Sequence, residues 1–454
     1  MVHIKTTKGL NIPIAGLPTG NIQELPRPHI ASLNLRPFDD IKFKLLVKAG
    51  DVVKIGQPLL ADKGSSDRVF VSPASGVVKD VLRGHKRHPT DIVIQLNDKD
   101  EHLENNPINL SNTSREDLVK ALLAGGFFAQ IRQRPFNTLA NPDKTPRSVF
   151  VKALESAPLT PSAEMQVEGF EREFAVGLHA LSMLTPGAVH LVYRSDTTSK
   201  AFREATHVTH HTAEGPHPIA NPSLHIQQID PVSSVDDVVW TVTARDVVDI
   251  GYYILTGRHN IERIISIAGP GILEGKTGFF RLRAGYPISA LIATRVPKGL
   301  YRYVSGNPLT GDQVESDDFL GFADTAFVVI PEAISREFLH FFRLGINKYT
   351  ASGAYISGHL KNSKRLYDFT TSLHGEPRPF VTGEPGVNVT PLNINPMLLC
   401  KALMAQDYEL ADSLGLLEVA PEDFALPTFV CPSKVEMTDI VKQGLKAYAL
   451  EVLK

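Results

Sequence analysis

The sequence predicts a multidomain fold that mixes β and α/β layers, because the pattern of apolar residues changes along the chain. Apolar residues at every second position are typical of a half-buried strand, and apolar residues three or four positions apart are typical of a helix. We expect a small barrel-like sandwich, an α/β domain, a β-grasp module, a mixed α/β segment and a helical cap, over residues 1–105, 106–258, 259–311, 312–375 and 376–454 respectively.

Composition limits what the chain can do. Its 454 residues are enough for roughly three or four domains. The formal net charge of −2 provides no polybasic surface for nucleic acid. Two cysteines cannot form a disulfide framework, which favours a reducing, cytoplasmic compartment. No apolar run reaches the ~18 residues of a membrane helix, so we expect any membrane role to be peripheral and through a partner.

The first segment predicts strands and a hairpin. Its alternating runs are separated by Gly, Pro, Asp and Ser; they are 42–47, 68–71, 76–82 and 91–96, before a polar linker at 97–113. The stretch GDVVKIGQPLLADKGSSDRVFVSPASGVVKDV, residues 50–81, resembles lipoyl and biotinyl carrier domains. Those domains place the modified lysine about three residues after Lys63, where this chain has Ser66. We therefore expect a carrier-like fold with an unmodified Lys63 beside a turn at 64–67.

The middle and end of the chain predict alternating elements. Ser114 and Asp117 form a capping pattern before an apolar helix, and Thr185-Pro186-Gly187 ends another helix. We expect strands at 148–153, 188–193, 263–268, 279–283, 301–304 and 326–330, and helices at 170–183, 289–293, 396–406, 408–414 and 435–453.

Four histidines lie close together in THVTHHTAEGPHP: His207, His210, His211 and His217. A metal site is one interpretation, but zinc sites usually include cysteine or carboxylate ligands, and the adjacent His210 and His211 would face opposite sides of a strand. We favour a solvated loop for the first three, and a hydrogen-bonded structural role in a tight turn for His217.

An ordered set of stretches resembles one known family, the A subunit of the bacterial sodium-translocating NADH:quinone reductase. The stretches are IKTTKGLNIPIAG (4–16), VKAGDVVKIGQPLLADK (47–63), SPASGVVKDVLRGHKR (72–87), RPFNTLA (134–140), EGPHP (214–218), YILTG (253–257), RYVSGNPLTG (302–311) and TFVCPSK (428–434). The resemblance implies a barrel-sandwich hybrid, a Rossmann-like α/β domain, a β-grasp module of the soluble-ligand-binding type and a helical cap.

The same resemblance implies a function. Such a protein is peripheral, lies on the cytoplasmic face of the bacterial inner membrane, and assembles with five other subunits, some of them in the membrane. The complex couples ubiquinone reduction by NADH to sodium export, and the isolated subunit is expected to be inactive. Two roles stay open within the complex: a contribution to the quinone-reduction step, or docking with no substrate site. An independent ligand-binding protein built on the β-grasp module is a third hypothesis.

The related families, the C subunit of the Rnf complex and the flavin-carrying NADH subunit of complex I, have features that this chain lacks. Their glycine-rich flavin loop is replaced by AGGFFAQIRQRPF, residues 124–136, with side chains where the loop has glycines. Of their cluster-binding cysteines only Cys431 remains, which we interpret as a buried relic, and Cys400 lies on an apolar helix face. We therefore expect no tightly bound flavin, NADH or iron–sulfur cluster, and ubiquinone only as a substrate of the complex.

Two Arg-Pro-Phe segments supply the candidate quinone-binding residues. Arg132, Arg134 and Phe136 belong to one, and Arg36 and Phe38 to the other. Arginine can donate to a quinone carbonyl, and aromatic rings can pack on its ring and tail. The alternative is that the arginines are surface or interface salt-bridge residues. Treating Arg132 and Arg134 as surface residues, we expect replacing both with alanine to leave the fold stable.

Overall fold

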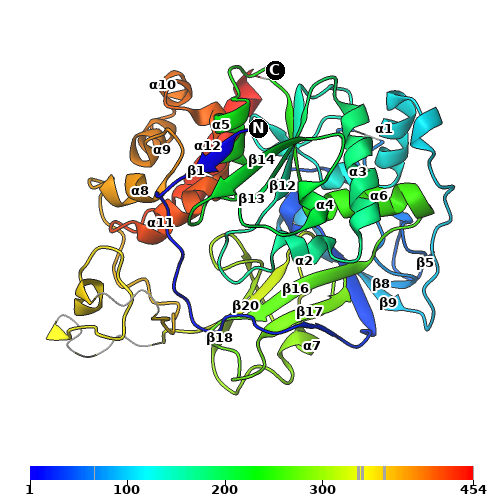
Figure 1. Cartoon of the computed structure of the whole chain (residues 1–454). Coiled ribbons are helices and arrows are strands. Elements are labelled where there is room, and N and C mark those ends of the chain that lie inside the picture. Colours follow the sequence, from blue (N-terminus) through cyan, green and yellow to red (C-terminus); the bar gives the residue numbers. More distant parts are fainter. Residues whose placement is uncertain (66, 335–337, 339–341, 361–364, 453–454) are drawn as a thin grey trace.

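The computed structural model describes residues 1–65, 67–334, 338, 342–360 and 365–452 (Figure 1). Within this part the elements follow the predicted order of sandwich, α/β domain, β-grasp module and helical cap. The multidomain mixed fold is confirmed. The strands and helices that were predicted with bounds begin and end within two residues of them.

The α/β domain is built on a seven-stranded sheet. Its strands, in spatial order, are β1 (His3–Lys5), β14 (Thr209–Glu214), β13 (Val189–Arg194), β12 (Ser148–Ala153), β15 (Val239–Thr243), β10 (Arg132–Arg134) and β11 (Thr138–Leu139). The first five are parallel, and β10 pairs antiparallel with both β15 and β11. The mostly parallel sheet is therefore confirmed, while the predicted solvated loop around His210 and His211 is wrong, because these residues form β14.

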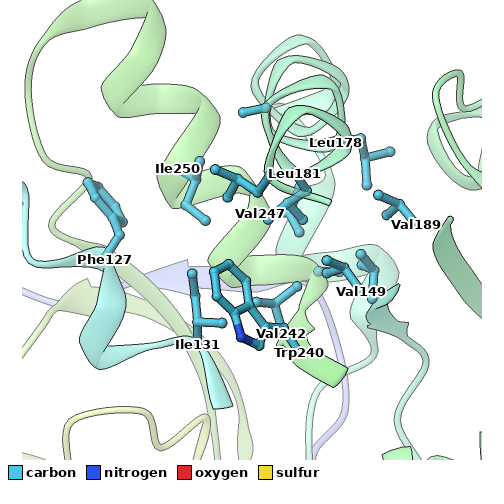
Figure 2. Close-up of a cluster of buried hydrophobic side chains, with 14 of the residues drawn as sticks. Phe127, Ile131, Val149, Leu178, Leu181, Val189, Trp240, Val242, Val247 and Ile250 are labelled. Atoms are coloured by element: carbon cyan, nitrogen blue, oxygen red, sulfur yellow. The ribbon is translucent and has the colours of Figure 1, made fainter. Parts of the chain in front are cut away.

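Helices cover both faces of this sheet. One face packs on α1 (Arg115–Ala124), α2 (Ala163–Val167), α3 (Glu171–Leu184), α4 (Lys200–Arg203) and α6 (Ala244–Thr256). Figure 2 shows part of this core, where Trp240 and Val242 of β15 meet Val247 and Ile250 of α6. Ser114 caps α1 as predicted. The other face packs on α5 (Pro222–Ile229) and the C-terminal cap.

The cap consists of α8 (Glu384–Val389), α9 (Pro396–Met404), α10 (Tyr408–Ser413), α11 (Ala425–Val430) and α12 (Met437–Val452). It shares one hydrophobic core with α5 and with Phe150 and Val239 of the sheet. Cys400 and Cys431 are both free and buried in this core, as expected.

The barrel-like sandwich is confirmed as two small sheets. One contains β3 (Ile30–Asn34), β9 (Pro89–Leu96), β8 (Gly76–Arg83) and β5 (Val52–Val53), and the other β4 (Phe43–Leu45), β6 (Pro58–Asp62) and β7 (Val69–Val71). Lys63 is exposed in the connection from β6 to β7, where the sequence predicts a turn. Ser66, the position of the modified lysine in carrier domains, lies outside the described residues.

A six-stranded sheet forms the β-grasp part. Its order is β19 (Asp312–Val314), β18 (Tyr301–Ser305), β20 (Ala326–Pro331), β16 (Glu262–Ala268), β17 (Gly278–Arg283) and β2 (Ile22–Glu24), with α7 (Ile288–Ile292) between β17 and β18. The sheet extends beyond residue 311, because β20 lies between β16 and β18. The N-terminal residues also leave the sandwich, since β1 and β2 join the two larger sheets.

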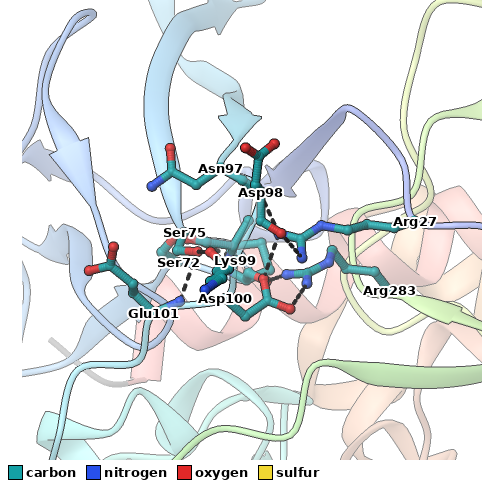
Figure 3. A network of polar contacts seen from close by, with 11 residues as sticks. Arg27, Ser72, Ser75, Asn97, Asp98, Lys99, Asp100, Glu101 and Arg283 are labelled. Carbon is teal, nitrogen blue, oxygen red and sulfur yellow. Dashed lines mark hydrogen bonds and ion pairs between the residues drawn. The ribbon is translucent and has the colours of Figure 1, made fainter.

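The polar linker after β9 connects the sandwich to the β-grasp sheet. Arg283 of β17 donates to Asp100 over 2.5 Å and to the Pro73 carbonyl over 3.2 Å. Arg27 donates to the Asn97 carbonyl and, over 2.9 Å, to Asp100 (Figure 3). Two arginines therefore hold one carboxylate, and this pairing fixes the linker against both modules.

Candidate functional site

The candidate site lies where the strand order of the α/β sheet reverses. The chain passes from β12 to β13 and β14 on one side, and then returns to place β15 on the other side of β12. In open α/β sheets the crevice at such a reversal, beyond the carboxyl ends of the strands, is the usual ligand site. Lys152 and Thr243 are directly opposite each other at these two strand ends.

Three cationic side chains share the face of the sheet that the cap covers. Arg134 is opposite Val239, Arg132 is opposite Thr241, and Lys152 is opposite Thr243. Directly opposite residues on neighbouring strands project from the same face. Because Val239 belongs to the core shared with the cap, all three cations project toward the cap.

Arg134 is buried, with an exposed fraction of 2%. Its Nη1 donates to Ser223 Oγ over 2.9 Å, and its Nη2 lies 3.8 Å from Glu422 Oε1. The expectation of a surface arginine is therefore wrong for Arg134, because the cap closes over β10. Burial lowers the pKa of Arg134, but the guanidinium stays charged since its ordinary pKa is far above neutrality.

Asp423 is a buried carboxyl that the cap adds on this face, next to Glu422. It accepts from the Asn221 side chain and from the Ala420 backbone N–H, each over 2.8 Å. Burial raises the pKa of Asp423, and Glu422 raises it further, whereas Arg134 lowers it. Arg134 of β10 and the carboxyls of the cap therefore attract each other across this interface.

Arg132 is half-buried and differs from Arg134 in its partners. Its guanidinium carbon lies 6.0 Å from the ring centroid of Phe38, which belongs to the sandwich. In the part of the chain that the structure describes, the guanidinium has neither a hydrogen bond nor a carboxylate within ion-pair distance. Burial lowers the pKa of Arg132, and the more distant carboxylates, chiefly Glu422 and Asp246, act against this. The guanidinium therefore retains N–H donors for a ligand.

Lys152 completes the set of cations. Its Nζ lies 2.7 Å from Glu155 Oε1. Burial lowers the pKa of Lys152, but Glu155, Glu422 and Asp246 outweigh that effect and raise it. Glu422, in the turn Pro421–Phe424 of the cap, is thus the carboxylate that acts on all three cations.

Sequence reasoning missed Lys152 and Glu422. A charged residue at the carboxyl end of a buried strand was a usable signal for Lys152. No local pattern marks Glu422, because its role depends on the docking of the cap.

The remaining candidate residues lie around this site. Phe136 is buried and its ring centroid is 6.0 Å from that of Tyr448 in α12. Phe38 is buried against Phe70 and Phe322, with centroids 4.8 Å and 5.1 Å away. Arg36 instead pairs with Asp318 over 2.5 Å, beside the β-grasp sheet. The structure therefore brings Arg132 and Phe38 together, places Arg134 and Phe136 on the cap side, and separates Arg36.

The segment that replaces the glycine-rich loop has regular structure. Gly125 follows α1, Gly126 takes a φ of 76°, and Phe127–Ala129 form one 3₁₀ turn before β10. Phe127 and Phe128 pack into the core of the α/β domain. The backbone here is thus used for packing and for an antiparallel strand.

The histidines have structural partners. The Val2 backbone N–H donates to His211 Nδ1 over 3.1 Å, so His211 Nε2 carries the proton that is shared with His190 Nδ1 over 3.0 Å. His217 is buried and its Nδ1 lies 3.0 Å from Ser156 Oγ, which confirms the structural role predicted for it. Burial lowers the pKa of His211 and of His217 to about 4. Among the described residues no group of three or more His, Cys, Asp or Glu side chains could hold a metal ion.

Comparison with known proteins supports a single family. Family models match as the NqrA N-terminal barrel-sandwich hybrid domain at residues 4–97, the NqrA second alpha/beta domain at 113–259, and the NQRA C-terminal domain at 264–316. A solved NAD+-reducing [NiFe]-hydrogenase aligns over 74% of this chain and 66% of its own, with 10% identity and a TM-score of 0.36, which is too low to carry an argument.

Curated relatives match along nearly the whole chain. The A subunit of the Na(+)-translocating NADH-quinone reductase of Chlamydia caviae is 36% identical over 99% of this chain and 97% of its own length. The corresponding proteins of Chlamydia pneumoniae, at 36% identity, and Cellvibrio japonicus, at 34%, match 99% and 97% of this chain and 98% of their own lengths. No helix in the described ranges is long and apolar enough to cross a membrane. The chain belongs to the NqrA family, the A subunits of the Na(+)-translocating NADH-quinone reductases.

Proposed function

We propose that this protein works at the cytoplasmic face of the membrane, within a sodium-translocating NADH:ubiquinone reductase, and contributes to the quinone-reduction step. It would assemble there with the other subunits, among them membrane subunits that form the sodium path. The observation that carries the proposal is the half-buried Arg132 guanidinium, which lies over Phe38 and has no carboxylate within ion-pair distance among the described residues.

Arg132 would act as a hydrogen-bond donor to a quinone carbonyl. Reduction places negative charge on the carbonyl oxygens, and a fixed guanidinium stabilises charge that develops in a site sheltered from water. Its partial burial reduces screening by solvent. Phe38, and Phe136 near α12, supply aromatic surface for the quinone ring and tail.

The chain would hold no flavin, NADH or cluster of its own. Side chains of β10 and the packed turn Phe127–Ala129 occupy the segment where related families have a glycine-rich loop. The electrons would therefore reach the quinone from other subunits.

Docking without a substrate site is the second candidate role. It is favoured by apolar side chains that remain exposed on the cap, such as Leu398 and Met404 of α9 at 44% and 63%. In this role Arg132 would matter only for how the protein fits its partners.

The test uses the whole complex with Arg132→Ala or Arg132→Lys. Arg281→Ala is the matched control, because Arg281 has a similarly half-buried side chain but pairs with Glu24 on the β-grasp sheet, away from this site. Arg132→Ala should lower kcat/KM for quinone about tenfold, or ~1.4 kcal/mol. Arg132→Lys should recover part of the loss, and Arg281→Ala should change little.

The outcomes separate the two roles. If Arg132→Ala gave normal quinone kinetics per assembled complex but a lower yield of complex, docking would remain as the function of the surface around Arg132. Normal kinetics and normal assembly would contradict both roles for Arg132.

A further inference from the structure

The chain that follows β20 exposes large apolar side chains to solvent. Their exposed fractions are 79% for Ile334, 80% for Phe338, 82% for Phe342, 70% for Leu344 and 53% for Ile346. Single exposed apolar residues are common on protein surfaces, but several within one short stretch indicate an interaction surface.

The neighbouring residues are attached to the body of the protein. The ring of Tyr349 lies 5.7 Å from Tyr367, 5.5 Å from Phe369 and 6.0 Å from Phe429 of α11. The Ile356 N–H donates to the Leu344 carbonyl over 2.9 Å. Figure 1 shows this gold-coloured segment at the edge of the molecule, next to α8 and α11. Tyr349 is therefore held against the body of the protein, close in sequence to the exposed side chains.

The charge of the same stretch differs from that of the whole chain. Between residues 334 and 366 the sequence has six basic residues, Arg336, Arg343, Lys348, Lys361, Lys364 and Arg365, against one acidic residue, Glu337. The formal net charge of the whole chain is −2. Three of these basic residues are described, Arg343, Lys348 and Arg365, and the described residues of the stretch include no acidic one. Positive charge together with exposed phenylalanine and leucine matches the two layers of an anionic bilayer, its negative headgroups and the acyl boundary beneath them.

We propose that the surface of Ile334, Phe338, Phe342, Leu344 and Ile346 docks on an anionic lipid bilayer. The two phenylalanines enter the acyl boundary, and the net positive charge of the stretch attracts the lipid phosphates. This attachment is independent of any role of Arg132 in quinone reduction. It would hold the chain at the membrane surface although no described helix spans a bilayer.

The test measures binding of the full chain to vesicles by co-sedimentation. One vesicle type is phosphatidylcholine alone, and the other contains about one third phosphatidylglycerol. The chain should bind the anionic vesicles at least tenfold more strongly. Binding should weaken when salt rises from about 0.1 M to 1 M, because the Debye length falls from ~10 Å to ~3 Å.

Paired variants identify the surface. Phe338→Ser plus Phe342→Ser should reduce binding at least tenfold, whereas Leu300→Ser, which changes a side chain 62% exposed elsewhere, should leave it unchanged. All three side chains are more than half exposed, so the variants should melt like the parent chain. Equal binding to both vesicle types, no binding, or an unaffected double variant would each overturn the proposal. Binding only to vesicles that carry the membrane subunits would also overturn it, and would assign the surface to a protein partner.

Discussion

Replacing Arg134 with alanine should strongly destabilise the α/β domain. The side chain is 2% exposed, and the substitution removes its hydrogen bond to Ser223 and the positive charge that faces Glu422 and Asp423. Removing one partner of a buried charge pair typically costs about 3–5 kcal/mol, because the other charge is left uncompensated. Arg132→Ala should cost about 1 kcal/mol or less, because its guanidinium has no carboxylate within ion-pair distance among the described residues.

Trp240 gives a local probe of this effect. It is the only tryptophan in the chain, is fully buried, and lies directly opposite Gln133 of β10. Urea unfolding followed by its fluorescence therefore reports the strand that carries Arg134. With a slope of about 2–3 kcal/mol per M, Arg134→Ala should lower the midpoint by more than about 1 M.

A double variant tests the electrostatic explanation. Arg134→Met keeps most of the side-chain volume but removes the positive charge that offsets the buried Asp423 carboxyl, so adding Asp423→Asn should recover part of the lost stability. The reasoning would be refuted if Arg134→Ala and Arg132→Ala lowered the midpoint equally. It would also fail if Asp423→Asn made the Arg134→Met variant less stable.

Three further predictions follow from the contacts. The pKa of His211 is about 4 in the folded chain, below its ordinary value of about 6.5. As pH falls, the unfolded chain therefore binds a proton at this histidine before the folded chain does, and the stability of the fold decreases between about pH 6.5 and pH 4. The stability advantage of the parent chain over His211→Gln should thus shrink by about 2 kcal/mol between pH 7 and pH 5, and a constant difference in urea unfolding would contradict this. Arg283→Ala should destabilise the chain by about 2–3 kcal/mol, because it removes the charged contact to Asp100. It should also speed hydrogen exchange at residues 97–101, and unchanged exchange there would contradict the conclusion that Arg283 holds the linker in place. The mass of the native chain should show no lipoyl or biotinyl group on Lys63, which faces solvent in the connection between β6 and β7; an added group would contradict the prediction.

Local periodicity was sufficient to predict the bounds of many strands and helices and the order of the modules. The strand Ser148–Ala153 was predicted with its observed bounds, and the helix expected at 170–183 is observed at Glu171–Leu184. These elements depend on side chains two to four positions apart, so the information lies within one short window of sequence. The family could also be predicted from the sequence, because each of its characteristic stretches is short and can be compared with this chain position by position.

Burial and partners were decided only by tertiary structure. RQRPF contains two arginines in nearly the same local setting, yet Arg134 is enclosed by the cap while Arg132 is only partly buried, over Phe38. Glu422 Oε1 lies 3.8 Å from Arg134 Nη2 although the two residues are almost 290 positions apart in the chain, and no pattern near either residue predicts that contact. His210 and His211 were likewise predicted to lie in a polar loop, but they belong to β14, which pairs with β13 and β1. A polar side chain becomes buried when distant elements close over it, and that depends on how whole faces pack rather than on the neighbouring residues.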